Sequence, residues 1–250
     1  MSDAERAADA AQSEPYTPPP LLGCLYCHTE GSTSLSAPRK FLGIGGDLPT
    51  LTCSHCHTIA LFEAGTPEAP HEWRIRYKKL SRAPRYYYMT VQFGTRWHTA
   101  EQAMQISRNG YAQRWRVRQA HSGDLTFLQP TRFSPPPPLM SYDELVYLTL
   151  SGVTLKQSSG GSLSATDETI LDAGTFYLTD QKVHLLGHRR DWSHKLSDIQ
   201  SVDYNERHWR IYVGANQQHY QGQNYPDQLD AQLFAAIVQA LLPKKEDEEG

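Results

Sequence analysis

The chain has 250 residues, which is room for one large domain or for two to three small ones. Hydrophobic residues make up 39% of it and the mean hydropathy is -0.58, which is on the polar side for a folded protein. The N-terminus lacks the basic and apolar regions of a signal peptide, and the longest apolar run, Leu233 to Leu242, is too short to span a bilayer. We therefore expect a cytoplasmic protein with no transmembrane segment.

Charge is distributed unevenly along the chain. Residues 71–118 carry 11 basic and 2 acidic residues, a net charge of +9, although the whole chain has a net charge of -3. Such a segment between two acidic flanks predicts a positive stripe on the surface. Residues 1–20 have no aliphatic periodicity and end in a proline run, so we expect a disordered tail there, and residues 244–250 are a charged tail.

All four cysteines lie in two Cys-x-x-Cys pairs, Cys24 with Cys27 and Cys53 with Cys56, separated by 25 residues. Each pair can place two thiolates on one tight turn, and two such turns facing each other make a tetrahedral site of four sulfurs. The pattern predicts a small domain over residues 21–70 that holds one structural Zn²⁺ ion.

Other uses of the cysteines are disulfides, redox chemistry and a catalytic zinc. Nothing in the chain indicates secretion, which disfavours disulfides, and a redox site needs one pair rather than two. Catalytic zinc usually has three protein ligands and an open position, whereas four cysteines close the site. His28, His55 and His57 could replace a thiolate in principle, but we expect them around the ligands or at the surface.

The two cysteine turns and the hairpin-like flanks at 40–44 and 58–62 resemble the zinc-ribbon superfamily over about 45 residues. Ribbons often have glycine directly after the second cysteine of each turn, where the chain turns tightly. Here these positions are His28 and His57, and a positive φ is uncommon but possible for histidine.

Residues 71–134 form a basic, aromatic-rich connector. Tyr86–Phe93 is predicted to be a strand, and Thr99 followed by Gln102 is typical of a capping box that opens a helix. Asn109-Gly110 is a plausible end for that helix, and residues 111–119 fit either a strand or a further helix. The small-residue face of the helix is made by Ala100, Ala103, Met104 and Ser107.

The connector is also the candidate anion-binding segment. Cations neutralise phosphates and aromatic rings stack on unpaired bases, so this composition suggests nucleic acid, although arginines can also pack between domains or meet anionic lipid. The candidate residues are Arg74, Arg76, Lys78, Lys79, Arg82, Arg85, Arg114, Arg116 and Arg118.

Residues 135–138 predict a stiff polyproline linker, and residues 139–243 predict a second folded domain that is mainly β. A Gly/Ser-rich loop is expected at 157–164, and a hairpin at 174–186 turns at Asp180-Gln181. Further strands are expected at 145–150, 153–155, 191–196, 199–204 and 209–213, and an amphipathic helix at 226–242. The fold class is therefore α+β, mainly β.

Within this domain, Gly174–Gly187 followed by Lys195–Ile199 is similar to the pattern of GRAM-type and bacterial PH-like domains. The resemblance covers about 100 residues. It implies a β-barrel closed by the C-terminal helix, which binds lipid head groups, membranes or proteins and is not a catalytic scaffold.

The sequence contains no nucleophile elbow, P-loop or zinc-protease motif. We expect the histidines, His184 and His188 among them, to be scattered, and the acidic pairs Asp143-Glu144 and Asp167-Glu168 to be solvated. The sequence thus predicts a non-catalytic adaptor or scaffold that binds another protein. The alternatives are nucleic-acid binding through the ribbon and residues 71–118, and peripheral binding of the PH-like domain to an anionic membrane.

Overall fold

The computed structural model describes residues 16–38, 48–78, 92–158, 168–214, 218–225 and 229–243. The chain divides into two compact units, Met1–Tyr111 and Ala112–Gly250. Within the described ranges, no helix is long and apolar enough to cross a membrane.

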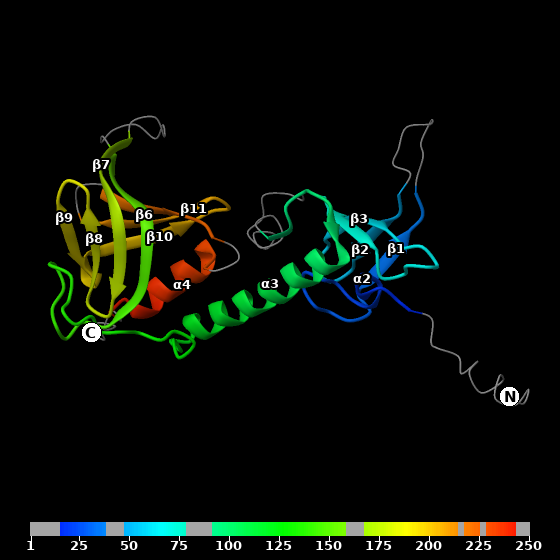
Figure 1. Cartoon of the computed structure of the whole chain (residues 1–250), viewed down its shortest axis with the longest axis horizontal. Coiled ribbons are helices and arrows are strands. Elements are labelled where there is room, and N and C mark those ends of the chain that lie inside the picture. Colours follow the sequence, from blue (N-terminus) through cyan, green and yellow to red (C-terminus); the bar gives the residue numbers. More distant parts are fainter. Residues whose placement is uncertain are drawn as a thin grey trace, which may run out of the picture. The chain divides into compact units, whose positions relative to one another are not determined.

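The first unit is built on an antiparallel sheet in the order β1-β2-β3-β4-β5 (Figure 1). Its strands are β1 (Thr33–Ser36), β2 (Thr50–Cys53), β3 (Ile59–Glu63), β4 (Arg74–Tyr77) and β5 (His98–Thr99), preceded by the short helix α2 (Pro19–Leu22). Alternate residues of β2, β3 and β4 are buried, among them Leu51, Phe62 and Ile75. This period of two gives the sheet one core face and one outer face.

The chain before α2 is ordered from Tyr16 onward, which corrects the prediction of a disordered tail for residues 16–20. The ring of Tyr16 lies 3.9 Å from that of His71, and the indole N–H of Trp73 donates to the Tyr16 hydroxyl at 3.3 Å. Aromatic contacts across more than fifty positions of sequence hold this segment in place, and the local composition cannot show them. Residues 1–15 lie outside the described residues.

The helix α3 runs without interruption from Ala100 to His121. The predicted capping box is present, since Gln102 N donates to Thr99 Oγ1 at 3.4 Å and Thr99 N donates to Gln102 Oε1 at 3.1 Å. The predicted end at Asn109-Gly110 is wrong. Gly110 is buried in the middle of the helix, where a Cβ would lie 2.0 Å from the side-chain oxygen of Gln92.

The first part of α3 packs within the first unit through small residues. Ala103, Ser107 and Gly110 are buried at helical spacing, and the Ser107 hydroxyl donates to the carbonyl of Leu25 at 2.7 Å. Small side chains allow the helix to approach the backbone around the first cysteine turn. Residues 86–91 of the predicted strand lie outside the described residues, and Phe93 is not in a strand.

The second unit is a seven-stranded antiparallel sheet in the order β10-β11-β12-β6-β7-β8-β9 (Figure 1). The first two strands, β6 (Val146–Ser158) and β7 (Glu168–Thr179), are the longest. They are followed by β8 (Lys182–Gly187), β9 (Asp191–Lys195), a 3-10 turn η3 (Leu196–Asp198), β10 (Ile199–Tyr204), β11 (His208–Val213) and β12 (Gln218–Gln223). The sheet curls into a half-barrel.

Most of the predicted strands are present. The hairpin turns at Asp180-Gln181 as expected, and the two predicted strands at 145–155 are one strand, β6, with a register shift around Gly152. The predicted loop at 157–164 begins too early, because Gln157 and Ser158 still belong to β6, and residues 159–167 lie outside the described residues. Strand β12 was not predicted.

The C-terminal helix α4 (Ala231–Leu241) covers the core of the second unit. It begins later than the predicted 226–242, because the side chain of Asp230 caps it by accepting a hydrogen bond from Leu233 N at 2.8 Å. The rings of Phe234 in α4 and Trp209 in β11 stack with centroids 3.8 Å apart, and Phe176 and Tyr220 complete this fully buried aromatic cluster. Such burial is the main stabilising contribution to the unit.

Candidate metal centre and charged surfaces

The four cysteines meet in the first unit and can hold a metal ion. Cys24 Sγ lies 3.6 Å from Cys56 Sγ, and Cys27 Sγ lies 3.7 Å from Cys53 Sγ. All four sulfurs lie within 4.8 Å of one another, and all four cysteines are free. Each sulfur of one turn therefore faces a sulfur of the other, at distances too long for disulfide bonds.

The two turns have the same backbone geometry. His28 N donates to Cys24 O at 2.8 Å and His57 N donates to Cys53 O at 2.9 Å. Both histidines have a φ of 60°, the left-handed conformation that favours glycine and is uncommon for other residues. The sequence contains a signal for this shared geometry beyond the spacing of the cysteines, because both turns read Cys-x-x-Cys-His-Thr.

The threonine of this repeat places a hydroxyl group beside the sulfurs. Thr29 Oγ1 lies 3.4 Å from Cys27 Sγ, and Thr58 Oγ1 lies 3.2 Å from Cys56 Sγ. Ser32 Oγ lies 3.2 Å from Cys53 Sγ. Hydroxyl groups around sulfur orient the ligands and stabilise negative charge on them, as groups surrounding a metal site commonly do.

The protein environment favours a thiolate at Cys24. Hydrogen bonds from the Cys56 thiol, from Thr58 and from the backbone N–H groups of Cys27 and Tyr26 lower the pKa of Cys24 to about 4, against the opposing effect of burial. The pKa of Cys56 is raised, because its proton is held in the hydrogen bond to Cys24. Thiolates are the form that binds metals.

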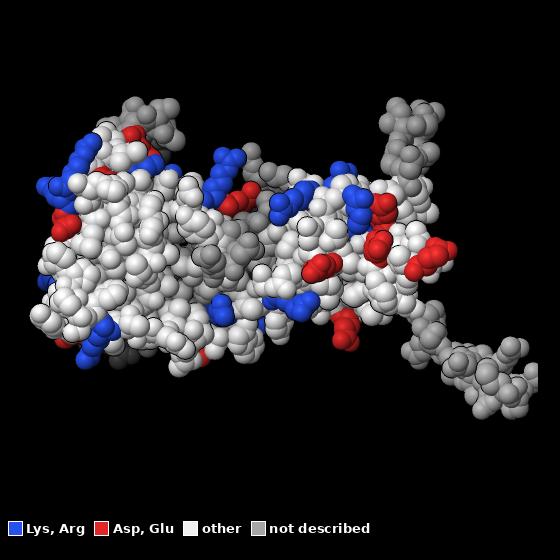
Figure 2. Space-filling model, viewed as in Figure 1, with Lys and Arg blue, Asp and Glu red and all other residues white. Residues whose placement is uncertain are grey.

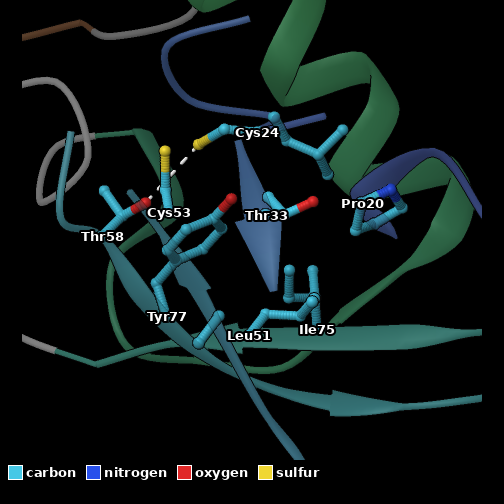
Figure 3. A pocket seen from close by; sticks show the side chains of 10 residues that line it. Pro20, Cys24, Thr33, Leu51, Cys53, Thr58, Ile75 and Tyr77 are labelled. Carbon is cyan, nitrogen blue, oxygen red and sulfur yellow. Dashed lines mark hydrogen bonds between the residues drawn. The ribbon is translucent and has the colours of Figure 1, made fainter. Parts of the chain in front are cut away.

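The space beside the cluster is too small for a substrate. Figure 3 shows the sulfur atoms of Cys24 and Cys53 at one end of a group of side chains, with the Tyr77 ring between them and Leu51. The cavity enclosed there is about 10 Å³, which is room for no more than one water molecule. Tyr77 is buried, and burial together with the nearby sulfurs raises its pKa. The arrangement suits a closed structural site.

The candidate cations of β4 lie on the outer face of the first sheet. Arg74 and Arg76 each place the guanidinium carbon 5.2 Å from the centre of the Trp97 ring. Lys78 follows at the same spacing and is exposed, and Glu63 opposite Arg74 lies 3.8 Å from it. The outer face thus places two of the predicted anion-binding residues, Arg74 and Arg76, on one aromatic ring, with the exposed Lys78 next along the chain on the same side.

The other candidates are placed differently. Lys79, Arg82 and Arg85 lie outside the described residues. The arginines at 114, 116 and 118 belong to α3 and to the second unit, so the strand that their alternation allowed is not formed.

In the second unit, a buried carboxylate orders a basic turn. Asp172 accepts hydrogen bonds from the backbone N–H groups of His188, Arg189 and Arg190 at 3.0 to 3.2 Å. Burial alone would raise the pKa of Asp172, but hydrogen bonds from the backbone and from Trp192 lower it to about 2. The turn borders an open pocket of about 310 Å³, and the Arg190 guanidinium lies 3.6 Å from the centre of the Trp192 ring.

A second buried carboxylate, Glu144, contradicts the prediction that it is solvated. Its Oε2 lies 2.7 Å from His184 Nε2 and accepts a hydrogen bond from the Thr179 hydroxyl at 2.9 Å, and both the glutamate and the histidine are buried. Burial would raise the pKa of Glu144, but these hydrogen bonds and one from Ser141 N lower it. The local sequence gave no sign of this pair, because its members are forty positions apart.

Glu168 also differs from the prediction of a solvated side chain. It is half-buried at the start of β7, where its carboxylate lies 3.0 Å from Lys156 Nζ and 3.7 Å from the guanidinium of Arg210. Burial would raise the pKa of Glu168, but these cations lower it. His219, 1% exposed, lies 3.6 Å from the same carboxylate. The histidines are therefore not all scattered at the surface.

No protein-family model matches the chain, and no curated protein matches it in sequence. The function must therefore be argued from the metal centre and the charged surfaces themselves.

Proposed function

We propose that the chain is a non-catalytic adaptor of a reducing compartment, in which a zinc-stabilised ribbon holds single-stranded nucleic acid and a PH-like unit carries a further binding surface. The observation that supports it best is the outer face of the first sheet, where Arg74 and Arg76 lie over the ring of Trp97 and the exposed Lys78 follows at the same spacing.

The chemistry of the four sulfur ligands supports zinc as the proposed metal. Four sulfur ligands favour zinc among the common ions, and a tetrahedral site with Zn–S bonds of about 2.3 Å has its sulfurs about 3.8 Å apart. The distances of 3.6 and 3.7 Å between facing sulfurs fit this value. When bound, zinc would cross-link the two turns and stabilise the first unit.

The outer face of the first sheet suits a phosphate backbone. Two guanidinium groups on one indole ring are held close together despite their like charge, because each is attracted to the ring face. The half-buried Leu61, opposite Arg76 in the register, leaves apolar surface beside the cations. A chain of phosphates with unpaired bases offers both negative charge and stacking faces to such a surface.

Fluorescence anisotropy with the full-length, zinc-loaded chain and a labelled oligothymidine of about 20 nucleotides tests this proposal. We expect binding that weakens with salt, with a slope near -2 if about three phosphates are neutralised. Arg76→Glu and Lys78→Glu should each weaken binding about tenfold, whereas Arg132→Glu, an exposed arginine of the second unit, should not. Binding that is equal in all four proteins would contradict the proposal.

A second candidate function is attachment to anionic membranes by the second unit. A curled seven-stranded antiparallel sheet with a C-terminal helix is the layout of PH-like domains, and the turn that Asp172 orders presents Arg189 and Arg190 beside a pocket. The full-length chain should sediment with vesicles of phosphatidylcholine and phosphatidylserine, and less with phosphatidylcholine alone. If Arg189→Glu with Arg190→Glu sediments as well as the unchanged chain, this function is excluded.

A further inference from the structure

The last part of α3, residues 112–121, has one buried and one exposed side within the second unit. Gln113, Val117 and Ala120 are buried. Trp115 is 53% exposed, and Arg116 and Arg118 are exposed. Figure 2 shows Lys and Arg atoms over the stretch where Figure 1 draws α3.

The exposed side has an ordered layout. Ala112, Trp115 and Gln119 follow one another at the spacing of successive helical turns and form a central strip. By the helical period of 100° per residue, Arg116 and Arg118 fall on opposite sides of this strip. The strip thus has one arginine on each side, and in coiled coils an apolar strip flanked by charged positions is the arrangement by which one helix receives another.

The charge of this part of α3 has one sign. Residues 112–121 contain three arginines and no acidic residue. No carboxylate lies three or four positions from Arg116 or Arg118 along the chain, and Arg118 lies four positions after Arg114, a spacing at which like charges destabilise a helix. Tryptophan and arginine are also the residue types that contribute most to binding at protein interfaces.

We propose that this surface, the α3 docking face (Ala112, Trp115, Arg116, Arg118 and Gln119), binds an acidic amphipathic helix of a partner protein. An apolar residue of the partner packs on Trp115, and carboxylates on either side of its apolar strip pair with Arg116 and Arg118. Charge complementarity selects this occupant, because a carboxylate matches the two-pronged guanidinium group and a cationic helix would be repelled.

A labelled synthetic peptide of Leu, Ala and Glu in heptads, with Glu flanking the apolar strip, serves as the probe, measured by anisotropy against the full-length, zinc-loaded chain. We expect binding that Trp115→Ala, Arg116→Glu and Arg118→Glu each weaken about tenfold. The matched control, Arg132→Glu, should change the affinity less than about twofold. Circular dichroism of each variant should show that the helix content is kept.

The same peptide with Lys in place of Glu should not bind. The proposal is overturned if both peptides bind equally well, or if the Glu peptide does not bind the unchanged chain. It is also overturned if a variant that combines Trp115→Ala, Arg116→Glu and Arg118→Glu binds the Glu peptide as well as the unchanged chain does. If the three docking-face variants weaken oligothymidine binding instead, the face belongs to nucleic acid and the proposal is also wrong. Variants at Arg76 and Lys78 should leave peptide binding unchanged, so this proposal and the proposed nucleic-acid function can fail separately.

Discussion

Histidine occupies the left-handed position that follows each cysteine pair, at His28 and His57. This conformation disfavours most side chains, and the cost is offset locally because each histidine N–H closes its turn onto a cysteine carbonyl. The residue types that form the four-cysteine cluster are thus not only the cysteines but also the histidine and threonine that follow each pair.

At the same scale, Asp230 limits the stability of the second unit at neutral pH. Burial raises its pKa to about 6, its Oδ1 caps α4, and its Oδ2 has no hydrogen-bond partner among the described residues. Because the folded pKa lies above the unfolded value, the unfolded chain loses this proton first, and stability falls as the pH rises from about 4 to about 6.

We expect Asp230→Asn to raise the free energy of unfolding at about pH 8 by about 2 kcal/mol, because the amide keeps the capping oxygen and carries no charge. At about pH 4 the variant and the unchanged chain should differ little. Urea unfolding at both pH values measures the effect, and a gain of equal size at the two values would show that the charge is not its cause.

Two glycines give a matched pair of predictions about close packing. A Cβ on Gly222 would lie 2.2 Å from the ring of Trp209, which is itself buried and stacked on Phe234. Gly222→Ala should therefore lower the free energy of unfolding by about 1–3 kcal/mol. Gly110→Ala meets only the end of the flexible Gln92 side chain and gains helix propensity, so its effect in thermal unfolding should be small. A larger loss at Gly110 than at Gly222 would contradict this account.

At the scale of elements, α3 shows where local sequence signals succeed and where they fail. The capping box of Thr99 and Gln102 placed the start of α3 correctly, because both hydrogen bonds form between residues three positions apart. In sequence, Gly110 is typical of a helix end. In the structure it lies inside the helix, and the glycine leaves room for the side chain of Gln92, which reaches it from another segment. Strand β12 was missed because its sequence, Gln-His-Tyr-Gln-Gly-Gln, has little apolar alternation.

The segment before β6 is held to the β7–β8 turn by Glu144. Its carboxylate meets His184 and Thr179, and Asp180 of the turn accepts a hydrogen bond from Leu145 N at 3.0 Å. Because hydrogen bonds lower the pKa of Glu144, the stability it contributes is present above its unfolded pKa and is lost as the pH falls through the folded pKa.

Glu144→Gln should lower the free energy of unfolding by about 3 kcal/mol near neutral pH, because it removes the charge from a buried pair. Its exposed neighbour provides the control, and Asp143→Asn should change stability by less than about 0.5 kcal/mol. Urea unfolding of the two variants decides between a buried and a solvated Glu144, since equal effects would mean that the carboxylate is not buried.

At the scale of the whole molecule, the division into two units predicts two unfolding transitions. The metal would stabilise the first unit alone, since all four cysteines belong to it. Chelation with EDTA should lower or abolish one transition in calorimetry and leave the other unchanged, and Cys24→Ser should do the same. Ser54→Ala, an exposed position between the two cysteines of the second turn, serves as the control. A single transition that shifts as a whole on chelation would refute the independence of the units.

The sequence by itself determined the cysteine cluster, the capping box, the hairpin at Asp180-Gln181 and the order of most strands. Each of these features is set by residues close together in the chain or, for the cysteines, by the spacing of two Cys-x-x-Cys pairs that favours one arrangement of four sulfurs. Only the tertiary structure decided that α3 continues past Gly110, that Glu144 is buried against His184, and that Arg74 and Arg76 share the ring of Trp97. These features depend on contacts between distant segments, where burial and packing outweigh local preference.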